Sequence, residues 1–504
     1  MSPPTIAIFL IFFSCLWILI QTLISKLKKK KLPPGPWSLP ILGNLHMLSN
    51  LPHRSLHDLA KKYGPIMSLR LGNIPTIVVS SPEAAELFLK THDANFAGRP
   101  RFQALDFMSS GVGLAEYGPY QRHVRKLCSL HLLCPSKLQV FAPLRREEIG
   151  LMVQSMKNAG EKGELVDVNE KIFELNEDIM YRMVLGCKTD DRFDLKGILK
   201  ETFLALGAFN LADFFPYLCS LDIQGLSRRF KRNSKRIDLL LETIIQDHEQ
   251  ANKTEMRSGQ RGHDHDFVDM LLSLMNQPLN FDGQVHLMDR TNMKAIIFDM
   301  IVASTHTSAV MVVWIFSELM RHPRVMKNLQ QELDSVIGKD RMVQEVTDLP
   351  KLGYLNMVVK ETFRLHPAGP LLFPHESIND TTVQGFKIAK KSRILINVWS
   401  IGRDPKLWSE NVEEFYPERF LDSKIDLQGQ DFQLIPFGSG RRGCPGMKLG
   451  LTTVQLVVAH LAHCFDWELP GGLQPQDLDM SEKFEMSLEK AVHVLAKPTY
   501  RLHI

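Results

Sequence analysis

A cysteine in a glycine-rich loop carries the strongest chemical signal in the sequence. Cys444 lies in the segment 437–446, which reads FGSGRRGCPG, and a helix-like segment over 447–465 follows it. Glycine lets a backbone approach a flat ligand closely, and backbone N–H groups at a helix start stabilise a thiolate. A thiolate in a dry loop is a soft ligand suited to iron, and Arg442 can pair with a carboxylate of a bound group. The pattern therefore predicts an iron site at Cys444.

The same loop contains a misleading motif. Gly438, Gly440 and Gly443 fit the pattern G-x-G-x-x-G. In a dinucleotide-binding unit this pattern follows a strand and precedes an acidic residue by about 20 positions. Here Pro436 interrupts the preceding segment, and position 463 is His463. We therefore do not expect the loop to bind a dinucleotide.

A second candidate lies at the centre of a long apolar segment. Residues 293–321 would form a helix about 40 Å long, buried on nearly all sides because most of them are apolar. The centre of this segment, 304–308, reads STHTS. Polar groups in a buried helix need partners or a purpose. The residues alone leave two interpretations equal, a polar notch beside a cofactor and a hydrogen-bonded patch between helices.

The elements that must position these residues are mostly helical. We expect a mainly α fold with a small β component. The polar segment 254–266 predicts a loop, and there we favour solvated side chains over a metal site at His263 and His265. The clearest helical patterns cover 81–91, 227–252, 293–321 and 350–366, and the clearest strands cover 74–80 and 393–398.

Charge and cysteine usage narrow the class of protein. The chain has 60 basic and 56 acidic side chains, and five of the basic ones are lysines within 26–31. Taking those five from 60 leaves 55 basic side chains against 56 acidic ones. A nucleic-acid binder carries a broad basic surface, so we expect no nucleic-acid partner. The seven cysteines are widely spaced without a C-x-x-C, which argues against a disulfide framework or a zinc site.

The N-terminus predicts a membrane anchor. Residues 5–24 are 20 mostly apolar residues, long enough as a helix to cross the hydrocarbon core of about 30 Å. The lysines follow this segment, so the positive-inside rule places the remaining chain in the cytosol. The next residues read LPPGP, which is typical of a stiff spacer. We expect an anchor at 1–31, a proline-rich hinge at 32–40 and one catalytic domain at 41–504.

Several motifs together resemble one family. Residues 437–446 match the cysteine-ligand loop of the cytochrome P-450 superfamily, F-x-x-G-x-R-x-C-x-G. Glu361 and Arg364, one helical turn apart, resemble the E-x-x-R motif of that family, and Arg419 resembles the arginine of its P-E-R-F element. The hinge with the following PILGN, 40–44, is similar to microsomal members and to the plant 71 clan in particular. The resemblance covers nearly the whole chain and implies a single haem domain behind a transmembrane helix.

The resemblance also implies roles for individual residues. Cys444 would be the axial ligand of haem b iron. The string ASTHTS at 303–308 aligns with the oxygen-activation motif A-G-x-D/E-T-T/S, which favours the functional notch. The expected haem-binding residues are Arg125, Gln121, Ala303, His375, Phe437, Gly440, Arg442 and Gly446, and the expected catalytic residues are Thr307, as a proton-delivering alcohol, and His306.

Three positions depart from the family pattern. His306 replaces an acid, Ser304 replaces a glycine that leaves room for oxygen, and Gln121 replaces a tryptophan beside a propionate. Glutamine can still donate a hydrogen bond. Histidine titrates near neutrality and can relay protons, although it could also point away and pack. We expect that turnover persists and that the coupling of NADPH use to product is altered.

The implied reaction is a monooxygenation. NADPH would supply electrons through a membrane-bound NADPH–cytochrome reductase, with cytochrome b5 as a further donor. One atom of O2 would enter a small hydrophobic substrate of plant metabolism, on the cytosolic side of the endoplasmic reticulum. By family position the apolar pocket would be lined by 101–113, Phe298, Val302, Ala303, Ala368, Leu371, Leu372 and 484–487, and the reductase would dock on Arg122, Lys126, Arg441 and Lys448.

Two other activities stay open. Family members that rearrange or dehydrate substrates without a reductase often lack the usual proton-relay residues, so His306 and Ser304 lend weight to such an isomerase or dehydratase. Product formation without NADPH would indicate that activity. The other alternative is a diverged haem-binding protein with little turnover.

Overall fold

A computed structural model describes residues 32–106, 111–188, 194–258, 266–275, 279–281, 284–286 and 288–503. Three predicted features lie outside these residues. They are the membrane-spanning segment 5–24 with its lysine cluster, the pair His263 and His265, and residues 107–110 of the expected pocket loop.

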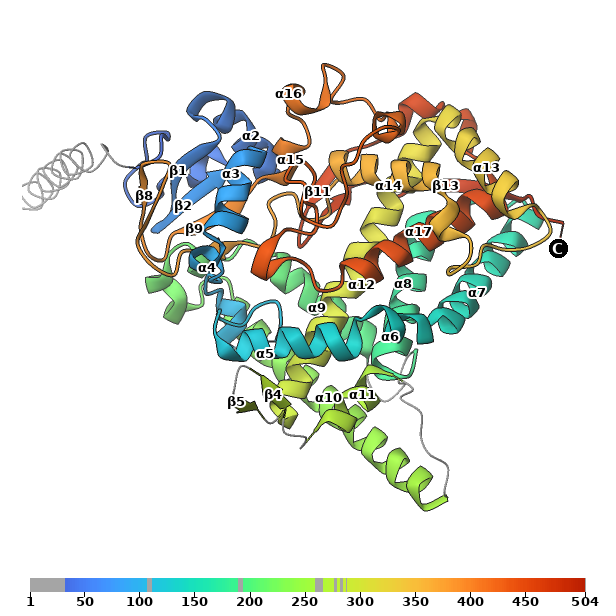
Figure 1. The fold of residues 1–504 in the computed structure, drawn as a ribbon, viewed down its shortest axis with the longest axis horizontal. Coiled ribbons are helices and arrows are strands. Elements are labelled where there is room, and N and C mark those ends of the chain that lie inside the picture. The colour runs from blue at the N-terminus through green and yellow to red at the C-terminus, as the bar shows by residue number, and fades with distance from the viewer. Residues whose placement is uncertain are drawn as a thin grey trace, which may run out of the picture.

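Helices dominate the described chain, as expected, and a strand-rich part lies beside them (Figure 1). The longer helices are α2 (Pro52–Tyr63), α5 (Pro119–Leu127), α7 (Ala142–Glu161), α8 (Val168–Leu185), α9 (Leu195–Gly207), α10 (Leu226–Ser258), α11 (Phe267–Leu274), α12 (Arg290–Arg321), α13 (Pro323–Ile337), α14 (Gly353–Leu365) and α17 (Met447–Cys464). The shorter ones are α3 (Pro82–Glu86), α4 (Asp93–Phe96), α6 (Pro135–Val140), α15 (Val398–Ile401) and α16 (Pro405–Trp408).

The largest sheet has the strand order β1-β2-β9-β6, and its strands are β1 (Ile66–Leu71), β2 (Ile74–Val79), β9 (Arg393–Ile396) and β6 (His375–Glu376). Strand β2 pairs with β1 antiparallel and with β9 parallel. A second sheet joins β10 (Phe465–Glu468), β13 (Leu495–Tyr500) and β3 (Val166–Asp167). Three hairpins complete the described strands: β4 (Leu279–Phe281) with β5 (Gln284–His286), β7 (Thr381–Val383) with β8 (Phe386–Ile388), and β11 (Glu482–Phe484) with β12 (Leu488–Lys490).

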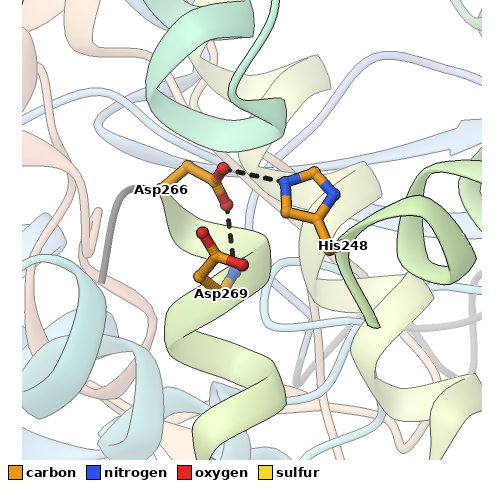
Figure 2. Close-up of side chains that lie close together, drawn as sticks. All are labelled: His248, Asp266 and Asp269. Atoms are coloured by element: carbon orange, nitrogen blue, oxygen red, sulfur yellow. Dashed lines mark hydrogen bonds and ion pairs between the residues drawn. The ribbon is translucent and has the colours of Figure 1, made fainter. Parts of the chain in front are cut away.

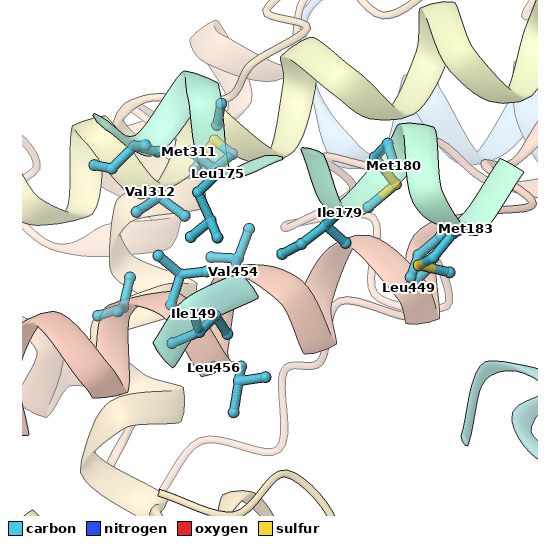
Figure 3. Close-up of a cluster of buried hydrophobic side chains, with 14 of the residues drawn as sticks. Ile149, Leu175, Ile179, Met180, Met183, Met311, Val312, Leu449, Val454 and Leu456 are labelled. Carbon is cyan, nitrogen blue, oxygen red and sulfur yellow. The ribbon is translucent and has the colours of Figure 1, made fainter. Parts of the chain in front are cut away.

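Helix α12 runs through the hydrophobic core. Figure 3 shows side chains of α7, α8, α12 and α17 gathered in this core, among them Ile149, Ile179, Met311 and Val454. The apolar residues around its circumference explain why the helix is buried on nearly all sides. Within the described residues, α12 alone has the length and hydropathy of a membrane span, but two thirds of its apolar window is buried inside the protein. It is therefore a core helix.

Element boundaries differ from the predictions in two informative places. Helix α12 begins at Arg290 because Asp289 and Asn292 form a reciprocal capping box. Helix α10 continues to Ser258, so the expectation of a loop from 254 was wrong for its first residues. The surface of α10 is highly charged, and Arg290 binds Glu242 and Glu249 on it. These ion pairs join the middle of α10 to the first residue of α12.

Candidate functional site

The loop that carries Cys444 is bent by glycines. Gly438 and Gly440 adopt φ values of 68° and 67°, which only glycine adopts without strain. A Cβ on Gly440 would lie 2.2 Å from the carbonyl oxygen of Leu89. The N–H of Cys444 donates to the carbonyl of Phe437 at 2.8 Å and closes the loop. The sequence therefore fixes the thiol directly before helix α17.

Cys444 is exposed to solvent, although many protein atoms surround its thiol. Desolvation raises the pKa of the thiol, while the N–H groups of Gly446 and Met447 and the charge of Arg125 act in the opposite direction. Without a metal the thiol therefore stays protonated at neutral pH. A bound metal cation deprotonates a coordinating thiol, and the two N–H groups are placed to stabilise the resulting negative charge.

The polar centre of α12 meets this loop. A Cβ on Gly450 of α17 would lie 3.7 Å from Ser308 Oγ and 3.9 Å from the ring of Phe437. Ala303 is exposed and Thr307 is half-buried, although the residues before and after this turn of α12 are buried. Residues four apart share one face of a helix. Ala303 and Thr307 thus form an open face of α12 next to Ser308, the residue that approaches the cysteine loop.

A cluster of cations lies beside the same loop. Arg125 donates to the carbonyl of Gly443 at 2.6 Å. Arg442 donates to the carbonyls of Ala97 at 2.8 Å and Ala115 at 2.6 Å, and its Nη1 is buried without a hydrogen-bond partner. In the described chain neither arginine forms an ion pair with a carboxylate. The carboxylate of Asp93 acts on both arginines electrostatically but pairs with Arg441 instead.

Arg99 also belongs to this cluster, although nothing in the sequence marks it as a site residue. Its guanidinium donates to the carbonyls of Gly113, Phe373 and Pro374. Burial and the charges of Arg442 and Arg125 lower its pKa to about 9. No motif links Arg99 to the cysteine loop at a fixed spacing, so only the folded chain brings them together.

His375 and Gln121 complete the surroundings of the cations. His375 is buried, and its Nδ1 lies 2.8 Å from the carbonyl oxygen of Phe96. Burial and the nearby charge of Arg99 lower its pKa to about 3, so the ring is neutral. Gln121 is buried, and its Nε2 has no hydrogen-bond partner. Orphaned donors beside arginines that lack a carboxylate partner among the described residues fit a flat group that carries carboxylates, as haem does.

The predicted charge triad is confirmed by the contacts. Arg364 Nε and Nη2 each donate to the Glu361 carboxylate at 2.8 Å, and Arg419 Nε donates to it at 2.9 Å. Arg364 also donates to three backbone carbonyls, those of residues 402, 412 and 414. A buried ion group is stable only when it is fully paired in this way. The triad joins α14 to the segment Pro417–Phe420, which precedes the cysteine loop in the chain.

His306 does not share the open face of Ala303 and Thr307. Its Nε2 lies 2.7 Å from Glu489 Oε1, on the C-terminal hairpin β11–β12. Its ring packs against Phe173 and Phe203, at centroid distances of 5.1 and 5.5 Å. Ser304 donates its hydroxyl to the carbonyl of Met300. Two of the departures from the family pattern are thus turned toward protein partners.

The remaining expected residues are placed as follows. Leu371 is buried, Leu372 and Ala368 are half-buried, and a Cβ on Gly438 would contact Leu372 at 3.8 Å. Phe298 is buried one helical turn before Val302. The four expected docking residues are all exposed: Arg122, Lys126, Arg441 and Lys448.

A second group of titratable side chains lies far along the chain, between α10 and α11. Figure 2 shows His248 directed at Asp266, with Nε2 2.9 Å from Oδ2. Asp266 also caps α11 by accepting from the N–H of Asp269 at 3.0 Å. Asp269 lies close enough to these two for a metal ion to be shared. The hydrogen bonds already account for the group as a helix cap.

Comparisons with known proteins agree with this geometry. The family model described as cytochrome P-450 matches residues 33–494. The chain is 55% identical over 491 residues to cytochrome P-450 CYP736A12 of Panax ginseng, which covers 96% of each protein. It is 44% identical over 448 residues to cytochrome P-450 71A1 of Persea americana, covering 87% of this chain and 88% of that protein. It is also 39% identical over 486 residues to flavonoid 3'-monooxygenase CYP75B137 of Crocosmia x crocosmiiflora, covering 94% and 93%.

These relatives favour a monooxygenase over the isomerase or dehydratase considered above, and they agree with the expected relation to the plant 71 clan. The exposed cysteine, the arginines without a carboxylate partner among the described residues and the match over nearly the whole chain lead to one conclusion. The chain belongs to the cytochrome P-450 family and is a haem-thiolate monooxygenase.

Proposed function

We propose that this monooxygenase takes electrons from NADPH through a membrane-bound reductase and inserts one atom of O2 into a small hydrophobic plant metabolite. The observation that supports the cofactor site most directly is the accessible thiol of Cys444 beside Arg99, Arg125 and Arg442. Three cations without a carboxylate partner among the described residues would be costly unless an anionic group binds them.

Each predicted site residue has a proposed task in holding haem. Cys444 binds the iron through its sulfur, and Arg125 and Arg442, joined by Arg99, hold the two propionates. His375 and Gln121 add neutral hydrogen bonds to these carboxylates. The orphaned Nη1 of Arg442 and Nε2 of Gln121 support this assignment.

The remaining residues shape the space around the cofactor. Gly440 and Gly446 keep the loop close to it, since a Cβ on Gly446 would lie 3.9 Å from Cys444 Sγ. Phe437 packs beneath the loop against Phe363, with a centroid distance of 5.1 Å. Ala303 forms the opposite wall with a small side chain that leaves room for O2.

When bound, haem supplies the activation of O2, with electron density from its thiolate ligand. The chain supplies protons. The Thr307 hydroxyl donates to the carbonyl of Ala303 at 2.9 Å on the open face of α12. Rotation about one bond lets this hydroxyl exchange hydrogen bonds with a water on that face. His306 lies next to Thr307 in the sequence, and an imidazole can both accept and donate a proton.

The proposed substrate is apolar and of small or medium size. The expected pocket residues Phe298, Leu371 and Leu372 are apolar, and Leu372 lies beside Gly438 of the cysteine loop, whereas few polar groups are expected to orient a ligand. The name of the Crocosmia relative refers to a flavonoid, so aromatic plant metabolites are the first class to screen.

The proposed location is the endoplasmic reticulum membrane, with residues 1–31 as a single-pass anchor and the catalytic domain in the cytosol. The positive charges of Arg122, Lys126, Arg441 and Lys448 are exposed and suit an acidic reductase surface or cytochrome b5. Steering of this kind weakens as salt concentration rises.

The test begins with the cofactor. Cys444→Ser should abolish the carbon monoxide difference band of a thiolate-ligated haem, while Cys134→Ser, at another accessible cysteine, should preserve it. The wild-type protein with a plant reductase should then consume NADPH when flavonoids or related aromatics shift its spin state. Product formed without NADPH would contradict the proposed reductase dependence and favour the isomerase or dehydratase activity.

A further inference from the structure

The partner of His306 is a carboxylate from a distant part of the chain. His306 Nε2 and Glu489 Oε1 are 2.7 Å apart, and 183 residues separate them in the sequence. The family pattern places an acid at position 306 itself. In this protein the acid is therefore present beside α12, but a different element provides it.

The hairpin that carries Glu489 is fixed against α12. The N–H of Leu488 donates to the carbonyl of Ala368, and Trp314 Nε1 donates to the carbonyl of Leu488, both at 2.8 Å. Lys483 lies directly opposite Glu489 across the hairpin. Lys483 binds Glu485 at 2.6 Å instead, which leaves Glu489 to His306.

Both members of the pair reach water. The His306 side chain is 16% exposed and that of Glu489 is 20% exposed. A neutral imidazole whose Nε2–H is held by a carboxylate presents Nδ1 as an acceptor. No protein group in the described chain forms a hydrogen bond with His306 Nδ1. The ring can therefore take up a proton from water at Nδ1.

We propose that Glu489 is the positioning residue that makes His306 a proton relay for the α12 notch. This inference rests on the proposed function. Glu489 fixes the tautomer and orientation of His306, and it stabilises the imidazolium that forms when Nδ1 takes up a proton. His306 then returns that proton to water on the way to Thr307.

Proton supply decides the fate of O2. With substrate, oxygen insertion uses O2, two electrons and two protons, and it yields hydroxylated substrate and one water. Without substrate, cleavage of the O–O bond uses four electrons and four protons from two NADPH and yields two waters. Two electrons and two protons yield hydrogen peroxide when the O–O bond is not cleaved. If protons reach the polar centre of α12 too slowly, the enzyme should therefore release more peroxide for each NADPH consumed.

The first experiment measures peroxide released per NADPH consumed, with purified holoenzyme, plant reductase and no added substrate. We expect Glu489→Gln to raise this ratio severalfold, to the level of His306→Gln, with an unchanged carbon monoxide spectrum. The exchanged pair, H306E with E489H, should lower the ratio again because it restores both groups. Glu410→Gln, the same change at an exposed site, should leave it unchanged.

The solvent isotope effect separates a relay from a merely structural contact. We expect NADPH consumption by Glu489→Gln in deuterium oxide to slow by a larger factor than that of the wild type. An unchanged peroxide ratio together with an unchanged isotope effect in Glu489→Gln would overturn the proposal.

A second measurement needs no electron supply. We expect the melting temperature of the double variant H306A with E489A to lie close to those of the two single variants, since one contact is lost in all three. If the loss of melting temperature in the double variant equals the sum of the losses in the two single variants, the proposed contact between His306 and Glu489 is overturned. Wild-type holoenzyme that consumes no NADPH would instead contradict the proposed reductase dependence, and the melting cycle would still judge the pair.

Discussion

A comparison of Gly440 with Gly225 distinguishes two ways in which a side chain at a positive φ can destabilise the fold, namely backbone strain and steric clash. Their φ values are nearly equal, 67° and 68°. A Cβ on Gly440 would meet the carbonyl oxygen of Leu89 at 2.2 Å, whereas a Cβ on Gly225 would have no neighbour within 4 Å. Backbone strain is thus common to both positions, and the steric clash belongs to Gly440 alone.

The first prediction concerns this pair. Gly225→Ala should cost about 1 kcal/mol of unfolding free energy, the strain of a left-handed backbone. Gly440→Ala should cost about 2 to 4 kcal/mol, because the backbone of Leu89 must also move. It should also lower the haem content of the purified protein. Denaturant unfolding and the Soret absorbance per protein measure both effects. Equal losses in the two variants would show that the close approach to Leu89 is unimportant.

The sequence predicted single residues where a motif has fixed spacing. The loop from Phe437 to Gly446 and the contact of Glu361 with Arg364 depend on residues near one another in the chain, so the pattern was sufficient. Arg99 and Glu489 were not predicted, because their partners come from other elements and each looks like an ordinary charged residue. Whether His306 faces the notch also depended on a hairpin 183 residues away.

At the scale of elements, the segment Pro417–Phe420 contains two adjacent residues whose ion pairs should contribute very differently to the free energy of unfolding. Arg419 binds the fully buried Glu361, whereas Arg324 binds the adjacent Glu418 at the surface, where the arginine is 57% exposed. Removing one partner of a buried pair leaves an uncompensated charge. When one partner of an exposed ion pair is removed, water replaces it at little cost in free energy.

The second prediction follows from this contrast. Arg419→Ala should cost about 3 to 5 kcal/mol of unfolding free energy and deplete the folded haem protein. Arg324→Ala should cost about 1 kcal/mol or less. Thermal unfolding of both purified variants checks the difference. A small loss for Arg419→Ala would mean that Arg364 alone satisfies Glu361.

The third prediction uses the contact between α10 and α11. Burial opposes the charge on His248, but the hydrogen bond and charge of Asp266 outweigh it and raise the pKa of His248 from 6.5 to about 9. A raised histidine pKa stabilises the fold below the unfolded value and loses this effect as pH rises through the folded value. Wild type should therefore exceed His248→Ala by about 1 to 2 kcal/mol at pH 6, allowing for partial exposure, and by much less at high pH.

Denaturant unfolding at both pH values measures this difference. His493→Ala is the matched control, since His493 binds Asp167 at 2.7 Å but is 58% exposed. It should change stability little at either pH. A difference between wild type and His248→Ala that does not depend on pH would contradict the assigned ion pair.

Helix and strand positions were largely predictable, because periodicity and capping are local. Helices α12 and α17 and strand β2 lie within a few residues of their expected bounds. The end of α10 was not predictable, because residues 254–258 are mostly polar and continue the helix without apolar periodicity. A polar helix end has no hydrophobic pattern to mark it.

At the scale of the whole molecule, the proline-rich segment is more than a spacer. The N–H of Ser68 on β1 donates to the carbonyl of Pro34 at 2.8 Å, and its hydroxyl donates to that of Pro33 at 2.7 Å. The main-chain N–H of Asn44 donates to the carbonyl of Arg70, and the N–H of Arg70 donates to the side-chain oxygen of Asn44. Strand β1 is the outer strand of its sheet, so this segment covers an otherwise open edge.

The last prediction compares two truncated variants that both lack the proposed anchor. Removal of 1–31 should release the protein from the membrane fraction and leave its melting temperature and carbon monoxide spectrum nearly unchanged. Removal of 1–44 should release it equally but also uncover β1, and an exposed strand edge promotes aggregation. Size-exclusion chromatography and Soret absorbance of the soluble fractions distinguish the two. Equal behaviour would mean that the contacts of Ser68 and Asn44 do not protect the sheet, whereas retention of both variants on membranes would place the membrane attachment elsewhere.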